Sequence, residues 1–168
     1  MPIFMDIHEV PGVKALDVAE AHRLDLQHQQ DFKCKCMTYW VDEARETIFC
    51  LIEGPNKDSV AALHGKAHGL LPSKIIEVNP ELVTSFLGRI YDPEDAEITP
   101  DGLKIINDPS FRILMVTAID DACMLENKVG KERSRELLQH HKNIIRKNIA
   151  RFEGHEVEHE GNGFIVSF

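Results

Sequence analysis

Residues 34–53 read CKCMTYWVDEARETIFCLIE. Two runs rich in aromatic and β-branched residues, 34–41 and 46–53, stand on either side of the polar tetrapeptide DEAR. Two such runs joined by a short polar segment are typical of a β-hairpin. The sequence therefore predicts two adjacent antiparallel strands here, and the elements on either side of this hairpin decide the fold.

The flanking sequence predicts a strand and a helix on each side of the hairpin. In chain order the predicted elements are a strand at 3–10, a helix at 16–30, the hairpin, a helix from 54–56 to about 68, a strand at 75–78, and a strand or helical turn within 81–91. The order βαββαβ predicts an α+β sandwich of the ferredoxin-like type, in which helices cover one face of an antiparallel sheet. Such cover leaves Phe4, Val10 and Trp40 exposed, which predicts a homodimer or a second sheet packed on them.

The second half of the chain predicts a linker followed by a smaller module. Residues 92–110 combine several acids with Pro93, Pro100 and Pro109, which is typical of a linker, here with one short strand at 103–106. The sequence thus predicts three parts, which are a ferredoxin-like domain at 1–91, a linker at 92–110 and a module at 111–168.

The module is predicted to have the order βααββ. Its predicted elements are a buried strand at 111–117, helices at 122–129 and 131–152, and a hairpin of 156–160 with 164–168 about Gly161-Asn162-Gly163. The last strand of such a unit is left with an open edge. We therefore expect it to pair elsewhere, or the full gene product to be longer.

Charge and cysteine content argue against several classes of protein. The 168 residues carry a net charge of −9, and both halves are acidic, which argues against a nucleic-acid partner. No apolar run approaches the roughly 20 residues that span a bilayer. The four cysteines form no Cys-x-x-Cys pair, and the N-terminus lacks the basic and apolar regions of a signal peptide. These features predict a reduced, cytoplasmic protein without a membrane role.

The most informative chemical pattern is a pair of histidines, His64 and His68, four residues apart on a predicted helix. They share its apolar stripe with Val60 and Ala61. Residues i and i+4 are neighbours on one helix face, so both imidazoles can bind one metal ion. The alternative is a pair of core histidines that hydrogen-bond to buried groups.

Further candidate ligands lie elsewhere in the first domain. They are His8, His22, Asp6, Asp25, Cys50 and Glu53. Nitrogen-rich sites with some oxygen suit Ni, Zn or Cu. If the helices cover the face of Ile3 and Ile7, His8 points away from the helical histidines, and a single site would need the sheet rim or a dimer interface. A core role for His22, and a polar pair of His8 with Asp6, are the alternatives to ligation.

Residues 1–78 resemble a family of small bacterial nickel-binding proteins that have a ferredoxin-like fold. The motifs that carry the resemblance are Met5-Asp6-Ile7-His8, Glu20-Ala21-His22 with Asp25-Leu26 and Gln29, Tyr39-Trp40, residues 49–53 (FCLIE) and residues 64–69 (HGKAHG). The resemblance implies a dimeric metal binder and favours nickel over zinc or copper. It also favours four ligands, which are His8, His22, His64 and His68. Asp6, Cys50 and Glu53 stay as weaker candidates.

The module resembles the opening third to half of a class III nucleotidyl cyclase domain. Residues 113–119 (ILMVTAI) stand where that family has its first strand and a metal-binding aspartate, and residues 160–164 (EGNGF) stand where it has Gly-Asp-Gly. Ala118 and Asn162 replace the two aspartates. Because these carboxylates hold the catalytic ions in such enzymes, the resemblance implies a degenerate cyclase module without activity.

Further departures from the cyclase pattern support the same interpretation. Asp120 and Asp121 are shifted along the chain relative to the missing aspartate, and Glu158 takes the place of a base-recognising lysine. We therefore expect this module to serve packing or dimerisation.

These patterns together predict a two-domain protein that binds a transition metal, nickel by the resemblance, with a sensing, storage or regulatory role. One alternative is a cofactor-free enzyme of the dimeric α+β-barrel type, in which His8, Asp6 and His22 act as acid and base. Another makes the chain a regulatory partner of a genuine nucleotidyl cyclase.

Overall fold

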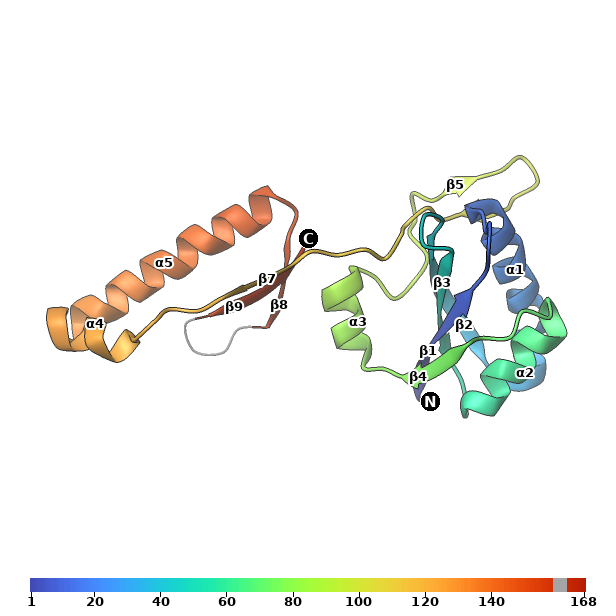
Figure 1. Ribbon diagram of the computed structural model, residues 1–168, viewed down its shortest axis with the longest axis horizontal. Coiled ribbons are helices and arrows are strands. Elements are labelled where there is room, and N and C mark those ends of the chain that lie inside the picture. The colour runs from blue at the N-terminus through green and yellow to red at the C-terminus, as the bar shows by residue number, and fades with distance from the viewer. Residues whose placement is uncertain (159–162) are drawn as a thin grey trace. The chain divides into compact units, whose positions relative to one another are not determined.

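Four antiparallel strands and two helices on one face of their sheet form the first part of the chain (Figure 1). The computed structural model describes residues 1–158 and 163–168. The elements are β1 (Ile3–Glu9), α1 (Ala15–His28), β2 (Lys35–Asp42), β3 (Thr47–Glu53), α2 (Lys57–Ala67) and β4 (Lys74–Glu77). The strand order is β2-β3-β1-β4, and every neighbouring pair is antiparallel. The predicted α+β class and βαββαβ order are therefore confirmed.

Local side-chain chemistry fixes the ends of these elements. In the β2–β3 turn, the Asp42 carboxylate accepts a hydrogen bond from the backbone N–H of Arg45 at 3.0 Å. Asn56 caps α2 by accepting from the backbone N–H of Ser59 at 2.9 Å, which satisfies one of the free donors of the first turn. After α2, Gly69 takes a φ of +82°, a conformation that glycine adopts without strain.

The sheet face beneath the helices carries Phe4, Asp6 and His8, because side chains alternate along β1. Phe4 is buried in the core with residues of α1 and α2, so the expectation that it is exposed is wrong. Trp40 is fully buried, and the Arg89 guanidinium lies over its ring at 4.4 Å. Neither side chain is therefore left exposed for a second sheet.

The segment 92–110, predicted to be a linker, adds to the core of the first part. It contains the short strands β5 (Glu97–Ile98) and β6 (Lys104–Ile105), which pair with each other. The Tyr39 hydroxyl donates to the Lys104 carbonyl at 3.2 Å and accepts from the Ile106 N–H at 2.9 Å. The segment also contributes two apolar side chains to the first core, because Leu103 and Ile106 are both buried there. The prolines and acids around them had indicated a linker.

Truncation of Leu103 measures how far this segment stabilises the first core. Leu103 is only 7% exposed, so Leu103→Ala is expected to lower the free energy of unfolding by about 2–4 kcal/mol. The control is Leu71→Ala, because Leu71 is 66% exposed and should change stability by less than about 0.5 kcal/mol. Urea unfolding followed by fluorescence measures the free energy of unfolding of both variants. Equal values for the two variants would show that residues 92–110 only connect the two units and do not stabilise the first core.

The remaining chain forms a second, smaller unit. Its elements are β7 (Leu114–Thr117), α4 (Ala122–Val129), α5 (Lys131–Arg151), β8 (His155–Glu158) and β9 (Phe164–Ser167). By internal contacts the first unit comprises residues 1–84 and 89–111, and the second comprises 85–88 and 112–168. Helix α3 (Pro80–Leu87) takes the helical alternative predicted within 81–91. The boundaries predicted after residues 91 and 110 stay predictions.

Two expectations about the second sheet are wrong. The strand order is β7-β9-β8, so the last strand is central and pairs on both sides. Strand β7 is not buried, because Leu114 and Val116 are exposed. The opposite sheet face packs on α5 through Phe164, Val166 and Ile149. The predicted turn at Gly161-Asn162 lies outside the described residues.

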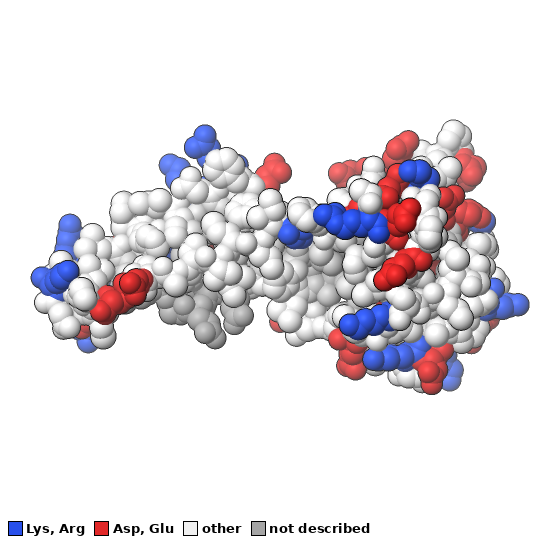
Figure 2. Space-filling view, in the orientation of Figure 1, with Lys and Arg blue, Asp and Glu red and all other residues white. Residues whose placement is uncertain are grey.

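Acidic and basic side chains are intermixed on the face of the first unit that Figure 2 shows, without an extended basic patch. This distribution agrees with the overall charge of −9 and gives no support to a nucleic-acid partner. Among residues 1–158 and 163–168, the helices are all too short or too polar to cross a membrane.

Candidate metal centre

Six side chains that can bind metal gather between the first sheet and its two helices. They are Asp6 and His8 of β1, Cys50 of β3, Asp25 of α1, His64 of α2, and His68 at the C-cap of α2. Five of them are buried, and His68 is partly buried. The sheet register places Asp6 directly opposite Cys50, which brings the strand residues together. We name two overlapping groups: the outer set is Asp25, His64 and His68, and the inner set is Asp6, His8, Cys50 and His64.

The outer set is a triangle of three donor atoms. His64 Nδ1 lies 3.0 Å from His68 Nε2 and 3.2 Å from Asp25 Oδ1. His68 Nε2 lies 3.3 Å from the same carboxylate oxygen. Three ligand atoms at such separations can all face one cation.

The backbone near the outer set constrains where the protons sit. The Leu70 N–H donates to His68 Nδ1 at 3.2 Å, so in neutral His68 the proton is on Nε2. The N–H groups of His64 and His68 then converge on one oxygen of Asp25. Asp25, His64 and His68 would hold a metal ion at this point, provided that His64 Nδ1 and His68 Nε2 give up these protons.

The inner set is held together by Asp6. One Asp6 oxygen lies 2.9 Å from His8 Nε2, and the other lies 3.1 Å from His64 Nε2. His8 Nδ1 is buried and has no hydrogen-bond partner among the described residues. Cys50 also belongs to this set, and burial raises the pKa of its thiol well above the usual value. Two imidazoles, a carboxylate and a thiol gathered in this way fit a metal site.

Opposite charges outweigh burial in setting the pKa values of the central groups. Burial lowers the pKa of His64, but hydrogen bonds to Asp25 and Asp6 raise it overall to about 10. Burial raises the pKa of Asp25, but His64 and His68 lower it overall to about 2. The pKa of Asp6 is likewise lowered, because His64 and His8 outweigh its burial. In the metal-free protein the proton on His64 therefore balances part of the negative charge.

A small cavity of about 20 Å³ borders both sets. Its lining includes His8, Asp25, Cys50 and His68, together with His22. This volume is close to that of one water-sized sphere, which is enough for a single ion or water and far below the size of an organic ligand. The donor set of imidazole, carboxylate and thiol fits a divalent transition ion.

Three of the four predicted histidine ligands belong to the two sets, whereas His22 lines the same cavity but belongs to neither set. His22 Nε2 faces Asp92 Oδ2 at 3.8 Å, and its ring lies 5.1 Å from that of Tyr39. Glu53 is at the far end of β3, where it binds the Met1 amino group at 3.1 Å. No local spacing pairs His22 with Asp92, since 70 residues separate them along the chain.

The relation of His8 to the helical histidines depends on which face of β1 the helices cover. They cover the Asp6 and His8 face, so no sheet rim or dimer interface is needed to join these ligands. On α1, Asp25 is only 2% exposed while the neighbouring Leu26 is 40% exposed. The polar cluster takes the buried position that hydrophobicity alone would give to leucine. Asp25, which the sequence analysis names among the candidate ligands, is brought against His64 and His68.

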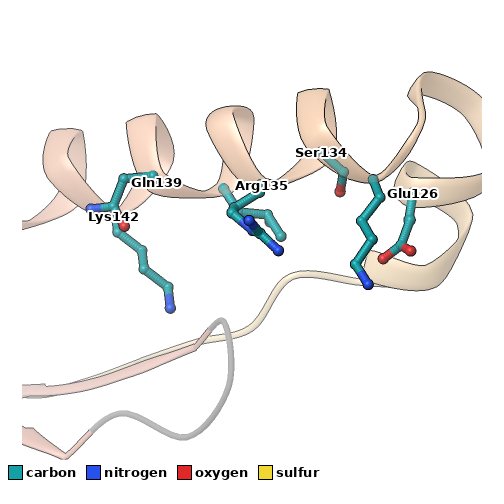
Figure 3. A pocket seen from close by; sticks show the side chains of 7 residues that line it. Glu126, Ser134, Arg135, Gln139 and Lys142 are labelled. Carbon is teal, nitrogen blue, oxygen red and sulfur yellow. The ribbon is translucent and has the colours of Figure 1, made fainter.

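The second unit has a larger and chemically different hollow of about 260 Å³ beneath α5 (Figure 3). Its lining consists of Glu126, Lys131, Ser134, Arg135, Leu138, Gln139 and Lys142. Three cations against one acid do not fit a metal ion. After β7 ends at Thr117, Asp121 caps α4, and its carboxylate accepts a hydrogen bond from the Met124 N–H at 2.8 Å.

The first unit matches a known family over most of its length. A family model described as nickel responsive protein SCO4226-like matches residues 4–78. The solved structure of SCO4226 from Streptomyces coelicolor A3(2) is similar at 35% sequence identity, over 45% of this chain and 94% of that chain, with a TM-score of 0.43. Through these residues, the chain belongs to the SCO4226-like nickel-responsive family. The resemblance predicted for residues 1–78 is therefore confirmed.

A weaker similarity extends beyond the SCO4226-like unit. The structure of a bacterial light-regulated adenylyl cyclase is similar at 12% identity with a TM-score of 0.33. This match covers 100% of the chain and 60% of the cyclase. A likeness at this level carries no argument about function, so the inactive cyclase-like module stays a prediction. No curated protein matches the chain.

Proposed function

We propose that the first unit binds a divalent transition metal ion, nickel by its family, and that the outer set takes the ion first. The observation that carries this proposal is the triangle of His64 Nδ1, His68 Nε2 and Asp25 Oδ1, with edges of 3.0–3.3 Å. Neighbouring ligands about 2.1 Å from a metal, at right angles, are about 3.0 Å apart. The donor atoms are thus already spaced for ligation before an ion arrives.

Asp6 supports the central ligand of this site from behind. It accepts a hydrogen bond from His64 Nε2 at 3.1 Å, on the side of the ring opposite the outer set. A carboxylate in this position fixes the tautomer and the orientation of a metal-bound histidine and makes it a better ligand. His68 provides access to solvent, because its side chain is 9% exposed whereas that of His64 is fully buried.

The size of the cavity favours ion binding over the alternative of a cofactor-free enzyme. His8 and Asp6 are adjacent, as that alternative requires, but the cavity beside them holds only about 20 Å³. Small-molecule sites generally enclose several hundred Å³. The SCO4226-like family is nickel responsive, which supports a sensing, storage or regulatory role for the bound ion.

The rest of the proposal concerns the second unit and the assembly. We propose that the second unit has no cyclase activity, which is supported by Ala118 at the position of a metal-binding aspartate. The carboxylate of Asp121 is engaged as a helix cap and is a poor substitute. A homodimer and a cytoplasmic location complete the proposal, the homodimer on the family resemblance and the location on the sequence.

Calorimetric titration of the untagged protein with nickel and zinc tests metal binding directly. The wild type is expected to bind, and His64→Ala/His68→Ala is expected to weaken binding on the order of 100-fold or more, because two of three outer ligands are removed. The control is His140→Ala, since His140 is exposed on α5. Circular dichroism confirms that each variant folds. A wild type that binds neither ion, or a double variant that binds as tightly, would contradict the proposal.

A further inference from the structure

The two ring nitrogens of His64 face different donor sets. Nδ1 faces Asp25 and His68 at 3.2 and 3.0 Å, and Nε2 faces Asp6 at 3.1 Å. The lone pairs of the two nitrogens of an imidazole point away from each other, so one ion cannot bind both. Each set therefore needs an ion of its own if both are used.

The spacing of the histidine rings is consistent with two ions. The ring centroids of His8 and His64 are 4.9 Å apart, and those of His64 and His68 are 5.0 Å apart. Two imidazoles bound next to each other on one ion place their centroids about 4.5–5.2 Å apart, given metal–nitrogen distances of about 2.0–2.1 Å. The His8 and His68 rings are farther apart, at 6.3 Å, so neither replaces the other as a neighbour of His64.

The inner set has independent marks of a ligand site. His8 lines the small cavity, and its Nε2 lies 2.9 Å from the carboxylate of Asp6. Cys50 lines the same cavity and adds a thiol, a donor that the outer set lacks. The four inner residues have ligand atoms within 4.8 Å of one another. Nothing in the outer set uses His8 or Cys50.

We propose that the inner set binds a second divalent ion and that His64 bridges the two ions. This inference rests on the proposed function, because the outer set must hold the first ion. The inner ion would bind Asp6, Cys50, His8 Nε2 and His64 Nε2: His64 Nε2 and the Cys50 sulfur would each release one proton to solvent, and the His8 proton would move from Nε2 to Nδ1. The charges then balance: two divalent cations face the carboxylates of Asp6 and Asp25, the Cys50 thiolate and the His64 imidazolate.

This charge balance explains why two ions are tolerated in a buried site. A single unpaired charge in such a place is costly, whereas four negative ligand groups offset four positive charges at close range. The second ion is expected to bind more weakly than the first, since all four inner ligands are buried whereas His68 of the outer set is partly exposed. It should also bind better at higher pH, because ligation releases protons.

The test is the number of nickel ions per chain, measured by elemental analysis of the untagged full chain after loading at pH 8 and gel filtration. The wild type is expected to hold two ions. Cys50→Ser and His8→Gln are each expected to hold one. The matched control is Cys123→Ser, which should hold two, because Cys123 is exposed and lies in the second unit.

Absorption spectroscopy gives a second readout that does not depend on stoichiometry. Nickel bound to a thiolate has a charge-transfer band in the near ultraviolet, which should appear only as the second equivalent binds and should be absent in Cys50→Ser. One ion per wild-type chain, or two ions in Cys50→Ser, overturns the bridged pair and leaves the outer site intact. Absence of any bound nickel instead overturns the proposed function itself.

Discussion

Asp6→Asn is expected to lower the free energy of unfolding of the metal-free protein by about 3 kcal/mol or more. Asp6 is fully buried and accepts hydrogen bonds from His8 and His64 at once. An amide of the same shape has only one oxygen, so its NH₂ group faces one of the two rings as a second donor. The change also removes one of the two negative charges that face His64.

The measurement is urea unfolding at pH 7 in the presence of a chelator. The matched control is Asp58→Asn, which makes the same chemical change on the exposed first turn of α2. It is expected to cost less than about 1 kcal/mol, mostly through the helix dipole. Equal losses in the two variants would mean that Asp6 does not hold the histidines in place.

The metal-free protein is expected to become less stable as the pH rises from 7 to 9. His64 has a pKa of about 10 when folded, against 6.5 ordinarily, because Asp25 and Asp6 outweigh its burial. In this pH range the folded chain keeps a proton that the unfolded chain has released. Stability should therefore fall by about 1.4 kcal/mol per pH unit. The contribution is complete below pH 6.5 and is lost as the pH passes through about 10.

Unfolding curves at several pH values, with and without His64→Gln, isolate this effect. The variant is less stable at every pH, but its stability should be nearly flat between pH 7 and 8.5. The three buried cysteines, Cys34, Cys36 and Cys50, add a loss of the same sign at higher pH, because burial raises their pKa values. Nickel affinity should change in the opposite direction and increase with pH. A wild-type slope equal to that of His64→Gln would rule out His64 as its source.

Most of the first fold could be predicted because its elements are short and have clear chemical boundaries. The hairpin about Asp42, the cap at Asn56 and the glycine stop at Gly69 are local signals, and the structure contains each of them. The segment 92–110 could not be read in this way. Its composition is polar, and Leu103 is recognised as core only once Tyr39 and the sheet are in place.

The same division between local and tertiary information applies to the candidate site. The i, i+4 spacing of His64 and His68 is local, and these two rings do lie together. The sequence could not decide which face of β1 lies beneath the helices, so the position of His8 was open. Hydrophobicity alone would bury Leu26 rather than Asp25, but Asp25 is the buried residue because it pairs with His64 and His68. Long-range pairings such as that of His22 with Asp92 leave no trace in sequence spacing.

The position of Trp40, beneath the guanidinium of Arg89, has a practical consequence for experiments in solution. Trp40 is the single tryptophan of the chain, and it is enclosed in the first unit. Intrinsic emission excited at long wavelength therefore reports the melting of that unit alone, with no background from the other. Far-ultraviolet dichroism reports the helices of both units, since α1 and α2 have 14 and 11 residues and α5 has 21. Comparing the two signals in one experiment shows whether the halves melt together or one after the other.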